Sequence, residues 1–191
     1  FLMAYPPPVQ VLSVPLFSQA DNRGGMGWRE CMSSSCAMVA AFHGRIGSDD
    51  DYCLVRKRYG DTTSPQAQIL ALRELGLSAR FITTGDRSKL LEELAAGRPV
   101  PVGWLHHGPA GAPCGGGHWS VAAGWAPDAV WMLDPNGEAN LSTGGYVSSR
   151  KGWQGWYSWR NWGPRWDARP PAPQGRTPGP AGWALLIRPT P

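Results

Sequence analysis

Long apolar segments and basic clusters are both missing from this sequence. No apolar run approaches the roughly 18 residues that a membrane-spanning helix needs. The net charge of +4 comes from Lys and Arg spread along the chain, which argues against a nucleic-acid partner. Residues 1–5 lack the basic start and the long apolar run of a signal peptide. We expect a soluble monomer with no membrane span, while secretion or release to a cell wall stays open.

Cysteine is also scarce. Four cysteines are too few for a disulfide framework in a chain of 191 residues, and they lack paired zinc-ligand spacing: Cys31, Cys36, Cys53 and Cys114. His106 and His107, with Cys114 nearby, invite a metal interpretation. No second cluster completes a set of four ligands, so we expect neither a metal nor another cofactor.

Charged residues make up only 17% of the chain, whereas 25 glycines and 19 prolines indicate many loops. The length suits one domain over residues 1–191. Apolar periodicity and end signals predict helices at Glu30 to His43, Asp50 to Tyr59, Ser64 to Leu75 and around Leu90 to Leu94. Strands are expected at 11–17, 79–83, 100–105, 118–125, 129–133 and 183–187. Helices precede most strands, which predicts an α+β fold with N-terminal helices packed on an antiparallel sheet.

Two further segments have distinctive compositions. Residues 1–10 contain three consecutive prolines and are expected to form an extended arm. Residues 163–182 are rich in Pro, Gly and Arg, and an apolar strand follows them. We interpret them as a long surface loop within the domain, not as a linker.

Cys31 lies at the start of a helix that is apolar on almost every face. The amino end of a helix stabilises a thiolate through its dipole and free N–H groups, so Cys31 is a candidate nucleophile. The alternative is a half-buried structural cysteine. Cys36 is expected to point into the core as a small apolar residue.

His118 follows three glycines and opens a strand that turns near Pro127 and returns to Asp134. Antiparallel pairing would bring both side chains to the same end of this hairpin, where Asp134 orients His118 as the base. Asp134 before Pro135 is also a common turn residue, and Asn136 is an alternative orienting group. Gln19 is a candidate donor to an oxyanion, although an isolated glutamine is more often a surface amide.

These residues lie in familiar surroundings. The segments around Gln19 (19–22), Cys31 (28–39), His118 (117–121) and Asp134 (133–135) resemble the motifs of the bacteriocin-processing, double-glycine-leader cysteine peptidases. The resemblance implies a papain-like fold and a site of Gln19, Cys31, His118 and Asp134. It departs from the family where Met32 and Ser33 replace the usual Gly-Pro, and nothing resembles a transporter, so a stand-alone phage or secreted type fits best.

The resemblance implies hydrolysis of peptide or amide bonds through a thioester. The substrate would be a peptide or the cross-peptide of peptidoglycan, as in a phage endolysin. Amidase or transglutaminase chemistry would use the same residues. A rival of another class is a degenerate module that binds wall glycans through Trp153, Trp156, Trp159, Trp162 and Trp166. We prefer a packing role for these rings.

Overall fold

The computed structural model describes residues 9–167 and 181–190. Its helices are α1 (Cys31–Phe42), α2 (Asp49–Lys57), α3 (Pro65–Glu74), α4 (Arg87–Ala95) and α5 (Trp159–Trp166), with short 3₁₀ turns η1 (Gln19–Asp21) and η2 (Gly27–Arg29). Its strands are β1 (Gln10–Val11), β2 (Leu77–Ile82), β3 (Val100–His107), β4 (Cys114–Ala126), β5 (Ala129–Asp134), β6 (Trp153–Ser158) and β7 (Trp183–Pro189).

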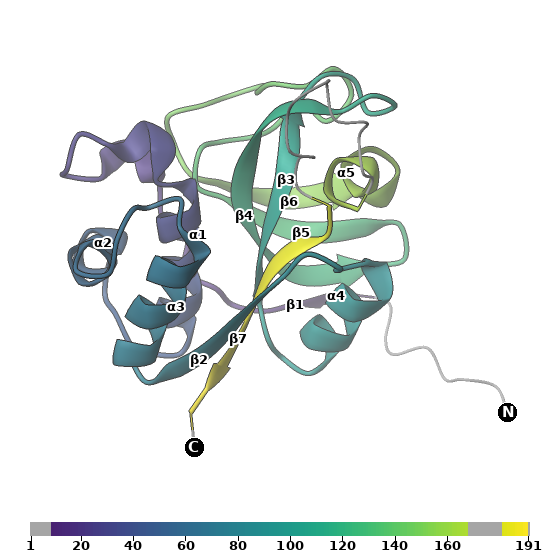
Figure 1. Ribbon diagram of the computed structural model, residues 1–191. Helices are drawn as coiled ribbons and strands as arrows, with labels where there is room; N and C mark the ends of the chain where they lie inside the picture. The colour runs from purple at the N-terminus through teal and green to yellow at the C-terminus, as the bar shows by residue number, and fades with distance from the viewer. Residues whose placement is uncertain (1–8, 168–180, 191) are drawn as a thin grey trace, which may run out of the picture.

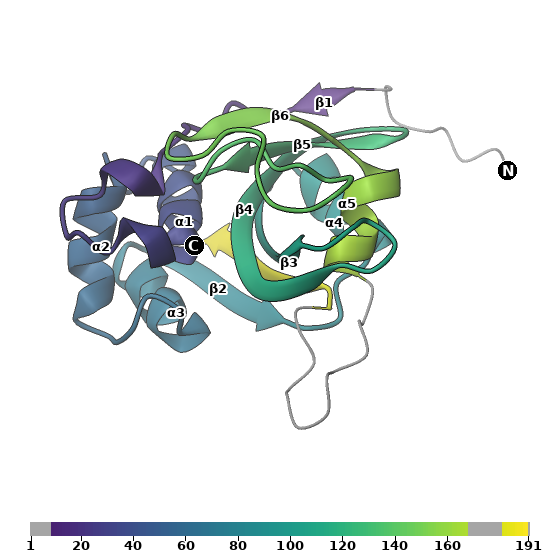
Figure 2. The same ribbon diagram turned by 90° about the horizontal axis from the view of Figure 1, so that it is seen from above.

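The strands form one seven-stranded sheet in the order β2-β7-β3-β4-β5-β6, and β1 pairs with β4 beside this path. Every pairing is antiparallel. Helices α1 to α3 pack on one face of the sheet, and α4 and α5 lie on the other (Figures 1 and 2). The predicted α+β class is confirmed, with helices covering both faces.

Two apolar clusters, one on each face of the sheet, explain why the strand sequences are almost continuously apolar. In β7, Leu185 and Ile187 face the cluster under α1 to α3, whereas Ala184 and Leu186 face the cluster under α4 and α5. Side chains alternate between the faces of a strand, so burial of both faces removes the polar positions. The sheet is therefore the shared centre of the core.

The helix ends follow the signals in the sequence. The Ser64 hydroxyl accepts a hydrogen bond from the backbone N–H of Ala67, and Pro65 is the first residue of α3. Gly44 and Gly76 follow α1 and α3 with φ near +67° and +75°, a conformation that glycine adopts without strain. The predicted bounds of these two helices are confirmed to within one residue.

The strand expected over residues 11–17 is wrong. Only Gln10 and Val11 pair as a strand, and the last backbone hydrogen bond from residues 11–17 to the sheet is the Leu12 N–H donating to the carbonyl of Ala123. Pro15 has no N–H and cannot continue a ladder. Most of the predicted arm, residues 1–8, lies outside the described residues.

Strand β6 and helix α5 were not expected from the sequence. Gly163 and Pro164 indicated a loop, but they lie inside α5, so the predicted loop over 163–182 begins too early. The helix forms despite these residues because Trp162, Arg165 and Trp166 are buried in the fold. Residues 168–180 of that loop lie outside the described part.

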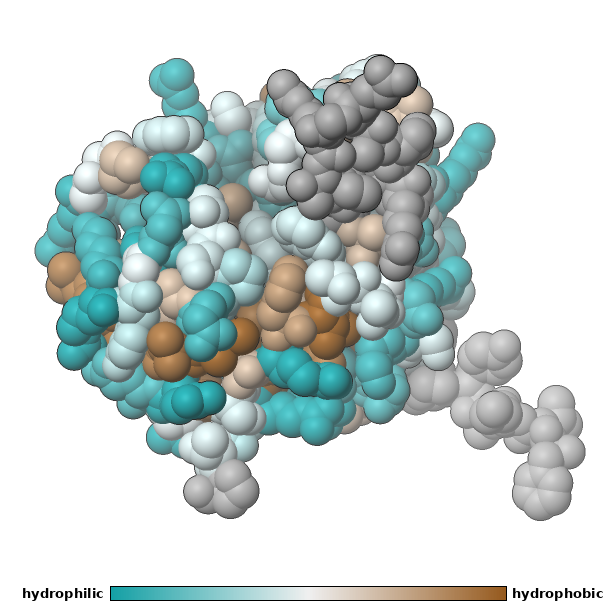
Figure 3. All heavy atoms as spheres, viewed as in Figure 1, coloured by the Kyte–Doolittle hydropathy of each residue, from teal (hydrophilic) through white to brown (hydrophobic). Residues whose placement is uncertain are grey.

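The surface view in Figure 3 shows polar side chains over most of the helical side of the molecule. Apolar side chains gather in a band across the middle, near β2 and β7. Within the ranges 9–167 and 181–190, no helix has the length and apolar character for a membrane span.

Candidate active site

Cys31 is the first residue of α1, and its side chain is half-buried. The following nine residues of the helix are all buried. Glu30 occupies the N-cap position without a side-chain bond to the first turn, which leaves the helix dipole and N–H groups for a negatively charged ligand or thiolate. Cys36 lies in the core as expected, where burial raises the pKa of its thiol to about 12.

His118 and Asp134 meet as the hairpin predicted. The Nε2 atom of His118 lies 2.8 Å from Oδ1 of Asp134, and both side chains are buried. The backbone N–H of Asn136 donates to the same oxygen at 3.0 Å, and the Tyr157 hydroxyl donates to Oδ2 at 3.2 Å. The carboxylate therefore contacts the imidazole, and Asn136 contributes its backbone, not its amide side chain.

A bulge in β4 makes this contact possible. The pairing register with β5 shifts between Ala122 and Gly124, where β4 contains one extra residue. In an unshifted register Asp134 would lie opposite Val121, and His118 would point to the other face of the sheet. With the shift, Val121 pairs with the residue before Asp134, and the two functional side chains share a face.

The effect of burial on the pKa of the His118 imidazole is outweighed by Asp134 and Cys31 together. Burial alone would lower the pKa of His118, but the Asp134 carboxylate and hydrogen bonds to Asp134 and Cys31 raise it to about 10. Because Nε2 faces Asp134, Nδ1 is the nitrogen left for the thiol. His118 thus lies between the Cys31 thiol and the Asp134 carboxylate, with one ring nitrogen for each.

Gln19 lies in η1 and is buried, beside Cys31 and His118. Its Nε2 donates to the carbonyl of Gly27 at 2.9 Å. A carbonyl can only accept, so the nitrogen must face it, which fixes the orientation of the amide. The second N–H of Gln19 stays available for an oxygen in the cleft.

Three solved structures are similar to this chain. A double glycine motif protease from an AMS/PCAT transporter, solved with its leader peptide, is 19% identical with a TM-score of 0.58, over 94% of each chain. The peptidase domain of Streptococcus ComA, a bifunctional ABC transporter, is 20% identical with a TM-score of 0.57, over 92% of this chain and 98% of that one. A C39-like peptidase from Bacillus anthracis is 14% identical with a TM-score of 0.55, over 93% and 96%.

The chain has the fold of the double-glycine peptidase domains. This confirms the papain-like fold expected from the motifs around Gln19, Cys31, His118 and Asp134. No family model and no curated protein matches the sequence, so the likeness is one of fold.

In this double-glycine peptidase fold, an open cleft of about 440 Å³ lies over the thiol. Met32 of α1 lines one side, and Trp119 and Trp183 of the sheet line the other. Trp28 of η2 stands at the rim with 77% of its surface exposed. The cleft thus lies between the helical layer and the sheet.

Two residues near His118 were not assigned to the site from the sequence. The rings of His106 and Tyr146 contact His118 edge-on, with centroids 5.6 Å and 5.8 Å away, and both residues line the cleft. Burial and the neighbouring histidines His118 and His107 lower the pKa of His106 to about 4. Alternation along β3 places Trp104 and His106 on one face, and this pattern is the sequence signal that could have assigned His106 to the site.

The structure also bears on the metal site and on the glycan-binding role of the tryptophans that were considered from the sequence. Within the described residues, no group of three or more His, Cys, Asp or Glu side chains could hold a metal ion. Of the tryptophan series, Trp159, Trp162 and Trp166 are buried in the cluster under α5, and only Trp156 is classed as exposed, at 40%. Packing therefore accounts for most of these rings.

Proposed function

We propose that this protein is a cysteine peptidase that hydrolyses peptide amide bonds through a thioester intermediate. The observation that supports it is that Cys31 and His118 line an open cleft, with Gln19 beside them and Asp134 buried behind His118. A nucleophile, a base, an orienting group and an oxyanion donor are the four parts that acyl transfer needs. The fold agrees, since the similar structures are described as peptidases.

In the proposed reaction, His118 holds the proton of the Cys31 thiol, and the thiolate attacks the scissile carbonyl. The N–H groups of Gln19 and of the Cys31 backbone donate to the oxyanion. His118 then gives its proton to the leaving amine, and a thioester remains. Water, deprotonated by His118, hydrolyses the thioester and restores the thiol, while Asp134 keeps the imidazole oriented.

An extended peptide is the substrate that the cleft suits best. The similar transporter protease was solved with a leader peptide, and we extend to this chain only the substrate class, a peptide. The second candidate is the cross-peptide of peptidoglycan, because a chain with a net charge of +4 would be attracted to an anionic cell wall. That reaction would make the protein a lysin of the phage type.

A parallel digestion separates these substrates. The protein and its Cys31→Ala variant are incubated with casein and with purified peptidoglycan, and new amino termini are mapped by mass spectrometry. New termini in casein, absent with the variant, support a general peptidase, and new termini only in peptidoglycan support the lysin. Cleavage of neither substrate, together with no selective alkylation of Cys31 by iodoacetamide, would contradict the proposed function.

Transfer and binding are separated from hydrolysis in the same assay. Added methylamine would appear in the products if the acyl group is transferred to amines. A binding module would retain peptidoglycan without producing termini. Burial of Trp159, Trp162 and Trp166 leaves the Trp-rich segment little surface for such binding.

A further inference from the structure

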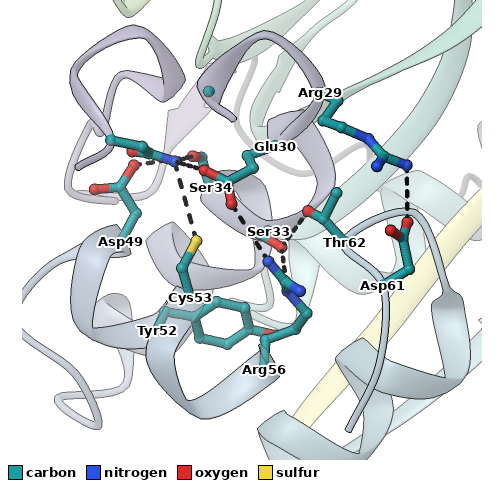
Figure 4. Close-up of polar contacts among 12 residues, drawn as sticks. Arg29, Glu30, Ser33, Ser34, Asp49, Tyr52, Cys53, Arg56, Asp61 and Thr62 are labelled. Atoms are coloured by element: carbon teal, nitrogen blue, oxygen red, sulfur yellow. Dashed lines mark hydrogen bonds and ion pairs between the residues drawn. The ribbon is translucent and has the colours of Figure 1, made fainter. Parts of the chain in front are cut away.

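A buried polar cluster lies directly behind the start of α1, and the proposed reaction does not use it (Figure 4). Glu30 is 2% exposed, Arg56 is 4% exposed and Asn22 is 8% exposed. Taking charged groups out of water is costly unless they are paired and hydrogen-bonded. The hydrogen-bond partners of Glu30 therefore show which segments of the chain this cluster joins.

The two oxygens of the Glu30 carboxylate bind two different segments. Oε1 pairs with Nη2 of Arg56 in α2 at 3.3 Å, whereas Oε2 accepts from Nδ2 of Asn22 at 2.8 Å. Arg56 is itself fixed by bonds to the Ser33 hydroxyl at 3.2 Å and to the Gly60 carbonyl at 2.8 Å. Glu30 thus joins the anchored helix α2 to the segment that contains Asn22.

Asn22 and Glu30 each lie in a segment that contains one of the candidate oxyanion donors. Glu30 immediately precedes Cys31, whose backbone N–H is one donor. Asn22 immediately follows η1, which begins with Gln19, the other donor. The carboxylate therefore connects the two donor segments through a buried hydrogen bond, and a longer bond from Nδ2 of Asn22 to the Ser34 hydroxyl of α1 at 3.3 Å supports it.

The Gln19 segment is packed tightly around this connection. The backbone N–H of Gln19 donates to the carbonyl of Pro135 at 2.9 Å. A Cβ added at Gly27 would lie 2.0 Å from the carbonyl oxygen of Gln19, so only glycine permits this approach. A small movement at Asn22 would thus be transmitted to Gln19 and not absorbed by empty space.

We propose that Asn22 and Glu30 are positioning residues whose hydrogen bond aligns the Gln19 amide with the backbone N–H of Cys31, so that both donors meet one oxyanion. The inference rests on the proposed function and adds residues that act through Gln19. Since loss of one oxyanion donor slows catalysis roughly 10² to 10³-fold, a displaced donor should cost part of that factor.

Two small reagents distinguish an oxyanion effect from a change in the thiol. With p-nitrophenyl acetate, the Cys31 thiolate attacks the carbonyl carbon and the carbonyl electron pair moves to oxygen. The pair then returns as p-nitrophenolate leaves, and an acetyl thioester is formed. With iodoacetamide, sulfur displaces iodide from carbon, and no oxyanion forms. Only the first reaction needs aligned donors.

The experiment compares both rates for the wild type, Asn22→Ala, Gln19→Ala and the double variant, with the rate of Cys31→Ala subtracted. We expect Asn22→Ala to slow acetylation about tenfold and alkylation less than about twofold. In the Gln19→Ala background, Asn22→Ala should have no further effect on acetylation. Tyr52→Phe is the matched control, because it removes the buried hydrogen bonds of the Tyr52 hydroxyl to Gln68, at 2.8 Å to Oε1 and 3.5 Å to the backbone carbonyl.

Unchanged acetylation in Asn22→Ala, or equal slowing of both reactions, would overturn the positioning role. So would additive losses in the double variant. If Asn22→Ala does not fold in thermal melts, Asn22→Leu, which has the same branched shape but no hydrogen-bonding atoms, takes its place with the same expected rates. A wild type whose Cys31 reacts with both reagents no faster than free cysteine would instead contradict the proposed function.

Discussion

Cys31 and Cys36 occupy one helix but have different surroundings. Cys31 lies half-buried at the helix start beside His118, whereas Cys36 has no exposed surface and packs in the core. We expect Cys31→Ala to abolish turnover and change the free energy of unfolding by less than about 1 kcal/mol. Cys36→Ser should remain active but lose about 1 to 3 kcal/mol, because a hydroxyl replaces an apolar contact.

Urea unfolding and peptide hydrolysis measure both effects on the same preparations. An inactive but fully stable Cys36→Ser protein would show that the nucleophile has been assigned to the wrong cysteine.

The pKa of His118 predicts the pH dependence of activity. Its folded-state pKa of about 10 lies above the ordinary 6.5, so the imidazolium persists through neutral pH and is lost as the pH rises toward 10. Activity should therefore decline near pH 10. Protonation of His118 also stabilises the fold fully below pH 6.5, and this contribution disappears between 6.5 and 10.

Two substitutions test this assignment by kcat/KM measured from pH 6 to 11. His118→Ala should be almost inactive, since no other group takes the thiol proton. Asp134→Asn should stay measurable, slower by up to about 10⁴-fold, and its alkaline decline should move to lower pH because the carboxylate charge that raises the pKa is gone. An unmoved decline in Asp134→Asn would remove His118 as its source.

Local signals explain which candidate site residues could be proposed from the sequence. Cys31 is marked by a helix start, and His118 and Asp134 by the two ends of a hairpin. Alternation along β3 could have placed His106 on the face of Trp104, whereas Tyr146 approaches His118 only through packing of the segment after β5, and no local pattern encodes that contact. The role of the Glu30 carboxylate was missed for the same reason.

At the scale of elements, helix α5 fixes the connection between β3 and β4. The guanidinium of Arg165 is buried and donates to the carbonyls of Leu105, His107, Gly108 and Leu141. A lysine cannot reproduce this planar set of donors. Arg165→Lys should therefore cost on the order of 3 kcal/mol of unfolding free energy.

Arg160→Lys is the control for this prediction, because Arg160 lies on the exposed side of the same helix. Thermal and urea unfolding of both variants should show a loss only for Arg165→Lys. Equal stability of the two variants would mean that the carbonyls find other donors.

Elements with strong end signals were predicted well, and α5 was not. Ser64 and Pro65 define the start of α3 within the local sequence. Helix α5 contains Gly163 and Pro164, which disfavour a helix, and it forms because its tryptophans are buried against the sheet. Burial by distant residues overrides local preference, so this helix could not be predicted from its own sequence.

At the scale of the whole molecule, the sheet couples the two apolar clusters. Trp104, Trp125, Trp159, Trp162 and Trp166 belong to the cluster under α4 and α5, whereas most helical residues lie on the other face. Because adjacent residues of β4 and β7 face both clusters, we expect both to unfold in one transition. Tryptophan fluorescence and far-ultraviolet circular dichroism should then give the same urea midpoint.

A urea midpoint that is lower by tryptophan fluorescence than by circular dichroism would show that the clusters unfold separately. Cys31→Ala serves as the reference protein for this comparison, since it avoids oxidation of the reactive thiol during long incubations.

The bulge between Ala122 and Gly124 also sets how the chain can tolerate insertions and deletions. Extra residues at the turn near Pro127 can loop out without altering the pairs behind it. One residue removed between His118 and Ala122, with the bulge retained, would turn the imidazole to the opposite face of the sheet, away from Asp134, whereas loss of the bulged Ala123 would leave the pairs from Ala122 onward unchanged. Changes of length in this protein should thus accumulate at the hairpin tip or at the bulge, and a second compensating change should accompany any that arises elsewhere between His118 and Gly124.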